Sequence, residues 1–279
     1  MSTRILEPPT GRLLDGLRAA WRRRVLVGFF GRQALEKLHT RTFLGRIWLL
    51  LRPGLDATLR IAVLGTLVGA ATPGVPYALF AAVGLTAWQL LEIGGYWTTR
   101  SLEMNRRVLR RTAFPRLPIL VGSAAPGLLY MAIYAVGTSA LMVVLSVADD
   151  YRYLVLDARL LEAVAGLAMI GLLGVAVGLW LAPLAVRYRD VRFGVSYALG
   201  LWFFLTPVIY PLAHVDGVLR TVARFNPVSA PVQLVQDGIL GTGGPDRVSL
   251  LAAVAVLAAL LAGGCVRFLR AEQRALGAV

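Results

Sequence analysis

Six apolar runs occupy most of this 279-residue chain, and each approaches or exceeds the length that a helix needs to cross a lipid bilayer. A membrane-spanning helix takes about 20 predominantly apolar residues, with a range of roughly 17 to 25. The runs cover residues 55–71, 77–97, 119–147, 160–182, 193–210 and 248–266. Only 16% of the residues are charged, whereas about 25% is usual for a soluble domain. The sequence therefore predicts an all-α integral membrane protein with six transmembrane helices.

The distribution of lysine and arginine predicts how these spans are oriented. Of the 29 basic residues, 23 fall in the two terminal segments and in the connections 98–118 and 183–192. Only five fall in the three other connections, and Arg60 lies inside the first span. Because cytoplasmic loops carry the excess of lysine and arginine, we expect both termini in the cytoplasm. The net charge of +14 is then a topology signal, and no nucleic-acid partner is expected.

The segment 1–53 precedes the first span and has an amphipathic pattern. Four apolar residues fall on one helical stripe and four arginines lie mostly off it: Leu13, Leu14, Leu17 and Trp21, against Arg12, Arg18, Arg22 and Arg23. This pattern is typical of a basic helix that lies in the plane of the lipid headgroups. The alternative is a disordered basic leader that only sets topology.

The residue patterns that catalysis requires are missing from the sequence. The only lysine, Lys37, follows Glu36, so the glycine-lysine pair of a phosphate-binding loop does not occur. The two histidines, His39 and His214, fall on opposite sides of the membrane in this topology. The single cysteine, Cys265, has no partner for a disulfide or a zinc site. We therefore expect no catalytic residue, no metal site and no cofactor in this chain, and the energy for any transport has to come from a partner.

Two charged residues lie inside the predicted spans. Arg60 and Glu92 are each six residues, or about 9 Å, from the cytoplasmic ends of the first and second spans. An unpaired charge near the bilayer centre costs on the order of 2.5–3.5 kcal/mol. We expect Arg60 to pair with Glu92, or with Asp56 one turn earlier. The alternative is a pathway for a proton or an ion.

The connection 98–118 contains the densest group of basic residues. Arg106, Arg107, Arg110 and Arg111 would fan across about 140° of a helix, with apolar residues to one side. A short amphipathic helix with an arginine face suits docking onto an acidic protein surface or onto lipid headgroups. The alternative is a solvated loop that only sets topology.

Two prolines, Pro207 and Pro211, lie near the external end of the fifth span. Proline removes a backbone hydrogen bond from a helix interior, and irregular backbone at membrane depth is tolerated only against protein or a water-filled path. A short apolar stripe follows and ends at Asn226 and Pro227. We expect two short helices that dip back from the external face and form a gate. The gate residues would be Pro207, Tyr210, Pro211, Phe225, Asn226 and Pro227.

Four stretches of the chain, spread over residues 42–240, resemble the membrane subunits of type-2 ABC exporters for polysaccharides. "SLEMNRRVLRRTAFPRLPIL" is similar to the family's loop between the second and third spans, with matches at Ser101, Leu102, Asn105, Phe114, Pro115 and Arg116. "TFLGRIWLLLRPGL" resembles the entry to the first span, with matches at Leu44, Gly45, Trp48 and Pro53. "YRDVRFGVSYALGLWFFLTPVIYPL" and "FNPVSAPVQLVQDGIL" resemble the fifth span and the external gate helices.

The resemblance implies one permease domain over residues 1–279. Its parts would be a cytoplasmic interfacial segment 1–53, spans one to five in 54–210, gate helices in 211–247, and the sixth span with its tail in 248–279. The loop would form a coupling helix that contacts a separate ATPase. This helix would contain the matched residues together with Arg106, Arg107, Arg110 and Arg111.

The resemblance also implies a homodimer with a channel between its subunits, in a bacterial plasma (inner) membrane. Two copies of the ATPase would bind ATP and Mg²⁺, and the cargo would be a lipid-linked polysaccharide such as an O-antigen, capsule, teichoic acid or cell-wall glycan. Aromatic residues that could contact the glycan are Tyr96, Trp97, Tyr130, Tyr134, Trp202 and Phe203. The alternatives are a type-2 permease for a drug or small lipid and a membrane-embedded enzyme that modifies glycans.

Overall fold

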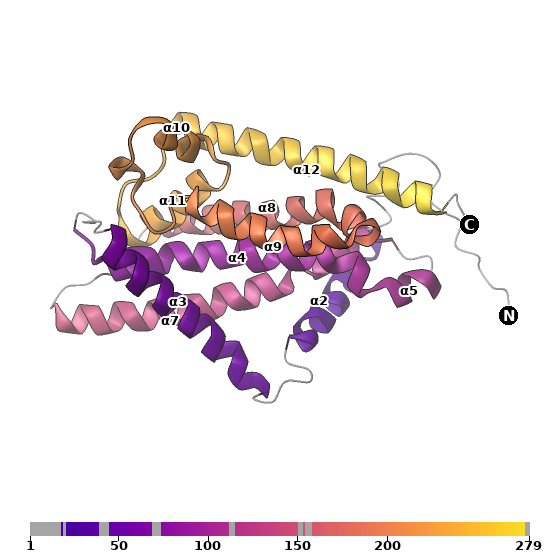
Figure 1. The fold of residues 1–279 in the computed structure, drawn as a ribbon, viewed down its shortest axis with the longest axis horizontal. Coiled ribbons are helices and arrows are strands. Elements are labelled where there is room, and N and C mark those ends of the chain that lie inside the picture. The colour runs from indigo at the N-terminus through magenta and orange to yellow at the C-terminus, as the bar shows by residue number, and fades with distance from the viewer. Residues whose placement is uncertain are drawn as a thin grey trace.

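The computed structural model describes residues 18, 21–38, 45–68, 74–111, 115–149, 153 and 158–276, and these residues form helices and no strand (Figure 1). The first half contains α2 (Val25–Lys37), η1 (Gly45–Ile47), α3 (Trp48–Val68), α4 (Tyr77–Met104), α5 (Arg106–Arg111), α6 (Leu117–Gly122) and α7 (Ala125–Ala148). The second half contains α8 (Leu160–Arg187), α9 (Arg189–Phe204), η2 (Leu212–His214), α10 (Gly217–Phe225), α11 (Ser229–Leu240) and α12 (Arg247–Leu276).

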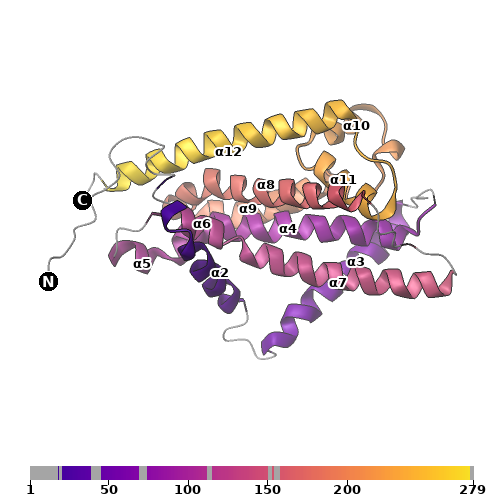
Figure 2. The same ribbon diagram turned by 180° about the vertical axis from the view of Figure 1, so that it is seen from behind.

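Helix α4 is the centre of a lengthwise bundle. It packs against α7 on one side and α8 on the other, and it also contacts α3, α9 and α11. Its apolar side chains point in all directions, as a helix surrounded by other helices requires, and Leu79, Leu85, Trp88 and Leu91 have no exposed surface. Figure 2 shows α2 and α3 leaning obliquely on one side of this bundle.

Four helical segments are long and apolar enough to cross a membrane: Tyr77–Met104, Leu117–Ala148, Leu160–Arg187 and Arg247–Glu272. They coincide with the second, third, fourth and sixth runs of the sequence. The all-α fold is thereby confirmed for the described residues, and four of the six expected spans are long and apolar enough to cross a membrane.

The first and fifth expected spans differ in the structure from their predicted bounds. Helix α3 begins at Trp48, not at residue 55, because charged residues lower hydropathy without interrupting backbone hydrogen bonds. Helix α9 has 16 residues and ends at Phe204, not at Tyr210. At 1.5 Å per residue it is about 24 Å long, which is shorter than a hydrocarbon core of about 30 Å. Proline at 207 ends it, since proline lacks the N–H group and disfavours a helical residue before it.

The two ends of the bundle carry different elements. Helix α5 and the C-terminal end of α12 lie at one end, which we name the α5 end (Figure 1). Helices α10 and α11 lie at the opposite end, named the α10 end, together with η2. The expected interfacial stripe lies mostly outside the described residues, because Leu13, Leu14 and Leu17 precede them. Trp21 is described and is 70% exposed.

A glycine allows the backbone after α9 to enter the core. A Cβ atom added at Gly84 of α4 would lie 2.2 Å from the carbonyl oxygen of Val208. Real Cβ atoms do not come this close, so any larger residue forces α4 and the segment around Val208 apart.

We expect Gly84→Ala to lower the free energy of unfolding by about 1–3 kcal/mol, because it overpacks a well-filled contact. The matched control is Gly137→Ala in α7, where no heavy atom lies within 4 Å of the added Cβ. That change should be neutral or stabilise the protein by up to about 1 kcal/mol, through helix propensity. Thermal unfolding in detergent measures both, and equal effects of the two changes would contradict the packing explanation.

Candidate functional site

The structure brings Arg60 into contact with both of the acids that the sequence offered as its partner. The Nη1 atom of Arg60 lies 3.5 Å from Oε2 of Glu92, and its Nε atom lies 3.0 Å from Oδ1 of Asp56. Both acids therefore contact one guanidinium, although the sequence left them as alternatives. The group carries one more negative than positive charge, since two carboxylates face one arginine.

Further side chains tie this group to four helices. The indole N–H of Trp88 donates to Oε2 of Glu92 at 2.7 Å, and the hydroxyl of Tyr134 donates to Oδ2 of Asp56 at 2.8 Å. The guanidinium of Arg60 lies 4.8 Å above the ring of Phe203, which also meets Trp88 edge-on. We name these six residues the polar cluster: Asp56, Arg60, Trp88, Glu92, Tyr134 and Phe203. It links α3, α4, α7 and α9.

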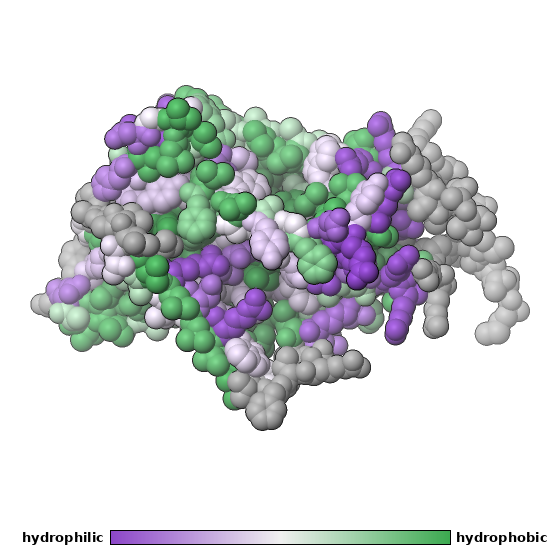
Figure 3. Space-filling view, in the orientation of Figure 1, coloured by the Kyte–Doolittle hydropathy of each residue, from purple (hydrophilic) through white to green (hydrophobic). Residues whose placement is uncertain are grey.

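The polar cluster is partly open at the surface of the subunit. The side chains of Arg60 and Glu92 are about a quarter exposed, at 25% and 24%. In the space-filling view, hydrophilic side chains gather on the bundle face beside α3, between apolar surfaces, and again towards the α5 end (Figure 3). Charges at membrane depth face a bundle interior or a water-filled cavity as a rule, so this face is unlike one that contacts lipid.

The aromatic residues proposed to contact a glycan divide into two groups. Tyr130, Tyr134 and Phe203 are at most 8% exposed and belong to the core of the subunit. Their burial leaves little ring face for a sugar in the single subunit, and contact of these three with a glycan stays a prediction. Helical spacing could not separate core aromatics from path-facing aromatics.

Tyr96, Trp97 and Trp202 are partly buried and keep accessible surface. The guanidinium of Arg100 donates to the hydroxyl of Tyr96 and lies against its ring. The indole N–H of Trp202 donates to Oδ1 of Asn226 at 3.0 Å. Both rings are therefore held in place by polar contacts at one edge.

The predicted coupling segment has a buried part and an exposed part. Ser101, Leu102 and Asn105 are buried, and Leu102 packs in a cluster with Phe268 of α12. The side chain of Asn105 ends α4 by donating to the carbonyl of Ser101 at 2.8 Å. These three residues anchor the segment and do not form a contact surface.

The exposed part is α5, where the side chains of Arg106 and Arg107 reach solvent. Arg110 and Arg111 belong to the same helix, but their side chains lie outside the described part of the chain. Phe114 also lies outside it, whereas Pro115 and Arg116 are half-buried just before α6. Two exposed guanidinium groups at the end of a rigid helix form a surface suited to an acidic partner.

Three residues that sequence reasoning missed hold this segment in place. Nζ of Lys37 in α2 donates to Oδ1 of Asn105 at 3.4 Å. Oε1 of Glu272 in α12 accepts from the backbone N–H of Arg116 at 3.0 Å. Glu103 lies 2.9 Å from Nη1 of Arg192 and 3.3 Å from Nη2 of Arg100, so it joins α4 to the start of α9. An acid isolated among arginines was the only signal for Glu103 in the sequence.

Asn226 is the hydrogen-bond centre of the α10 end. Its Nδ2 donates to Oγ1 of Thr206 at 2.9 Å and to the carbonyl of Leu205 at 3.1 Å. Its Oδ1 accepts from Trp202, as above, and from the backbone N–H of Val228 at 3.1 Å. This 7% exposed amide thus satisfies backbone groups that the end of α9 leaves open.

The irregular segment after α9 is buried in protein, as its membrane depth requires. Pro207, Val208 and Ile209 are buried, and Nε2 of Gln236 in α11 donates to the carbonyl of Val208 at 3.1 Å. Among the remaining gate candidates, the hydroxyl of Tyr210 donates to the carbonyl of Phe204 at 3.1 Å. Pro211 precedes η2, Phe225 is 48% exposed at the end of α10, and Pro227 is half-buried.

An exposed ion pair joins α10 to α12. Nε and Nη2 of Arg224 each lie 3.0 Å from an oxygen of Asp246. Oδ1 of Asp246 also accepts from the backbone N–H groups of Val248 and Ser249, at 3.1 Å each, and so caps α12. The hydrogen bonds from Arg224 and Ser249 hold the pKa of the Asp246 carboxyl well below its usual range.

This pKa shift predicts a dependence of stability on pH. A carboxyl whose folded-state pKa is lowered stabilises the fold above its unfolded pKa, near about 3.9, and loses that contribution as pH falls through the folded pKa. Asp246→Asn should therefore lower the melting temperature of the detergent-solubilised protein at pH 7, and the difference from wild type should shrink below about pH 4. A difference that is constant from pH 7 to pH 3 would contradict it.

Within the described residues, no group of three or more His, Cys, Asp or Glu side chains could hold a metal ion.

The sequence matches the model of the family described as ABC-2 type transporter over residues 37–240. The O-antigen export system permease protein RfbA of Myxococcus xanthus is 25% identical over 229 residues, which is 81% of this chain and 85% of that relative. The family match covers the polar cluster, α5 and the α10 end. The chain belongs to the ABC-2 type transporter family.

Proposed function

We propose that this chain is the membrane subunit of an ATP-driven exporter that moves a lipid-linked polysaccharide from the cytoplasmic to the external face of the membrane. The observation that carries the proposal is the contrast between the two ends of one bundle. An exposed arginine helix lies at one end, and a buried irregular segment clamped by Asn226 lies at the other. The similarity to an O-antigen export permease supports this class of cargo.

The proposal includes six membrane passes within a single permease domain. Helix α3 completes the first pass, because the charges of Asp56 and Arg60 are paired inside the polar cluster. Helix α9 completes the fifth together with the buried residues that follow it. Because cytoplasmic loops carry the excess of basic residues, the α5 end and both termini would lie in the cytoplasm, and the α10 end would lie outside a bacterial inner membrane.

The energy would come from two copies of a separate ATPase subunit that binds ATP and Mg²⁺. Helix α5 would be the docking element, with Arg106 and Arg107 meeting acidic residues of that subunit. The bonds of Asn105 to α2 and of Glu272 to the start of α6 support this role. They tie the residues on either side of α5 to α2 and α12, so a movement of the ATPase would reach the bundle through them.

The path would lie on the polar face beside α3, closed by a second copy of the chain. Partly exposed charges of the polar cluster need water or protein around them at this depth, and a path between two subunits supplies both. Tyr96, Trp97 and Trp202 would offer ring faces to passing sugars. The segment around Val208, with α10 and α11, would form the external gate.

The test is export in a strain that lacks the gene for this chain. Supplying the chain with its ATPase should restore surface glycan, and an ATPase whose phosphate-loop lysine is replaced should not. The purified complex should contain two copies of each subunit by native mass spectrometry. Normal surface glycan in the deletion strain, together with restored resistance to a drug on complementation, would instead favour a permease for small amphiphiles.

A further inference from the structure

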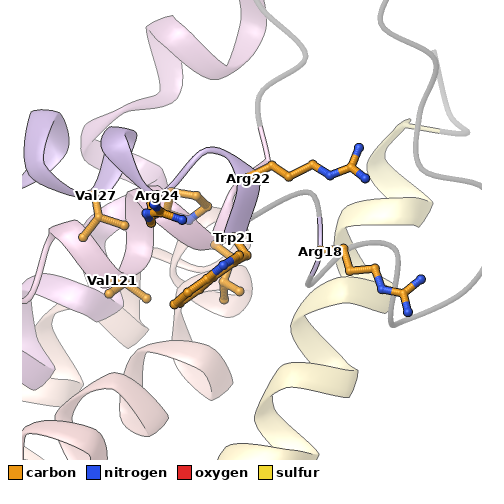
Figure 4. Close-up of a pocket in the computed structure, with 8 residues that line it drawn as sticks. Arg18, Trp21, Arg22, Arg24, Val27 and Val121 are labelled. Carbon is orange, nitrogen blue, oxygen red and sulfur yellow. The ribbon is translucent and has the colours of Figure 1, made fainter.

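A cavity of about 580 Å³ lies where residues 18 and 21–24 and the start of α2 meet α6. Such a volume is within the range of roughly 300–1,000 Å³ that is typical of ligand pockets. Its lining residues are Arg18, Trp21, Arg22, Arg24, Val27, Leu117, Pro118 and Val121 (Figure 4). None of them belongs to the polar cluster or the gate, and Arg18, Trp21 and Arg22 are part of the segment expected to lie in the plane of the lipid headgroups.

The floor of the cavity is apolar and comes from two closely packed helices. A Cβ atom at Gly122 of α6 would lie 2.6 Å from the carbonyl oxygen of Val27 in α2, so only glycine permits this approach. The contact brings Val27 beside Val121, with Leu117 and Pro118 one turn away on α6. The floor is therefore part of a rigid contact between α2 and α6.

The rim of the cavity is cationic. Figure 4 shows Arg18 and Arg22 extending on one side of Trp21, and Arg24 on its other side near Val27 and Val121. The guanidinium of Arg24 lies 5.5 Å from the centre of the Trp21 ring. Among the described residues that line the cavity, none carries a carboxylate. Arginine stays charged at all relevant pH values, so an anion at this rim meets positive charge and an aromatic edge.

The position of the cavity indicates what occupies it. The apolar span Leu117–Ala148 begins with the residues of the floor, so the cavity lies at the boundary of the membrane at the α5 end. A lipid of the adjacent leaflet presents its headgroup and the upper part of its acyl chains at this level. An apolar floor below a rim of arginines is complementary to a phospholipid whose headgroup carries net negative charge.

We propose that this cavity binds an anionic phospholipid of the bilayer, with the headgroup at the arginine rim and the acyl chains along Val27, Leu117 and Val121. The bound lipid stabilises α2 against α6, and through Lys37 it supports the end of α4 from which α5 extends. The site needs the membrane but not the exported glycan. Failure of this proposal therefore leaves the proposed function untouched.

The experiment titrates the full chain in detergent micelles with phosphatidylglycerol or phosphatidylcholine of the same acyl length, and native mass spectrometry gives the apparent Kd. Wild type should bind phosphatidylglycerol more tightly. Each arginine near an anionic headgroup contributes about fivefold, so Arg22→Gln with Arg24→Gln should weaken that binding by about 25-fold. Val121→Trp fills the floor of the cavity and keeps all charges, so it should weaken the binding of both lipids.

The matched control is Arg187→Gln with Arg267→Gln, which removes two exposed arginines that also lie over aromatic rings, those of Tyr188 and Trp180. It should leave the Kd for phosphatidylglycerol within about twofold of the wild-type value, because neither residue lines the cavity.

Farnesyl diphosphate and inorganic phosphate serve as competitors, and neither should displace phosphatidylglycerol. The proposal is overturned if the control loses as much affinity as the rim variant, if wild type does not distinguish the two lipids, or if Val121→Trp binds normally. Displacement by farnesyl diphosphate would assign the cavity to a diphosphate lipid carrier instead, and displacement by phosphate to a simple anion site.

Discussion

Replacing Arg60 with methionine is expected to lower the free energy of unfolding by about 3 kcal/mol, the low end of the cost of breaking a buried ion pair. The change keeps most of the side-chain volume but removes the cation that contacts both Asp56 and Glu92. It also removes the contact of the guanidinium with the ring of Phe203. Denaturation by SDS titration of the protein in mixed micelles measures the loss.

The same geometry predicts that Glu92→Gln lowers the free energy of unfolding much less, by about 1 kcal/mol. Arg60 keeps its 3.0 Å contact with Asp56, and the glutamine oxygen still accepts from Trp88. A triple variant with Arg60→Met, Asp56→Asn and Glu92→Gln has no charge left and should recover much of the stability. A single Arg60→Met variant as stable as wild type would mean that water, and not Arg60, compensates the two acids.

The pairing of Arg60 was predictable because it follows from depth alone. Two charges at the same level of neighbouring spans are expected to meet, since each is costly by itself. The network around them was not predictable. Trp88 was given no role and Tyr134 was expected to contact a glycan, and only the rotation of α4 and α7 about their axes aims their polar atoms at the two carboxylates. Hydropathy specifies depth in the membrane but not this rotation.

The ends of the helices were also not predictable from hydropathy. Hydropathy located the apolar runs, but α3 starts before its run and α9 ends before the end of its own. The prolines at 207 and 211 marked the place where regular structure stops. The bonds from Asn226 and Gln236 that satisfy the irregular backbone come from residues about twenty positions later or more. Contacts at such sequence separation leave no periodic pattern to recognise.

The coupling segment was predicted from a resemblance to a family motif, and such a motif does not separate anchoring residues from contact residues. Burial makes that distinction. Ser101, Leu102 and Asn105 face the bundle, whereas Arg106 and Arg107 face solvent. Substitutions in the first group should therefore act through folding, and substitutions in the second through docking.

Reversing the charge of both exposed arginines, Arg106→Glu with Arg107→Glu, is expected to lower co-purification of the ATPase subunit at least about tenfold. Like charges placed together at an interface cost several kcal/mol, and each 1.4 kcal/mol corresponds to about tenfold in affinity. The melting temperature of the permease alone should stay within about 2 °C of wild type, because substitutions at exposed positions usually change stability by less than about 0.5 kcal/mol. ATPase bound per permease and glycan export are the two measurements.

Two comparison variants separate docking from the gate. Arg220→Glu with Arg247→Glu makes the same change of net charge with exposed residues at the α10 end, and it should leave ATPase binding unchanged. Asn226→Ala leaves the indole of Trp202 and the carbonyl of Leu205 without partners, at a cost of about 1–3 kcal/mol. It should keep ATPase binding while export falls, because the irregular segment loses its clamp. If the α5 reversal binds the ATPase normally while the α10-end reversal abolishes binding, the bundle is inserted in the opposite orientation and α5 is not the docking element.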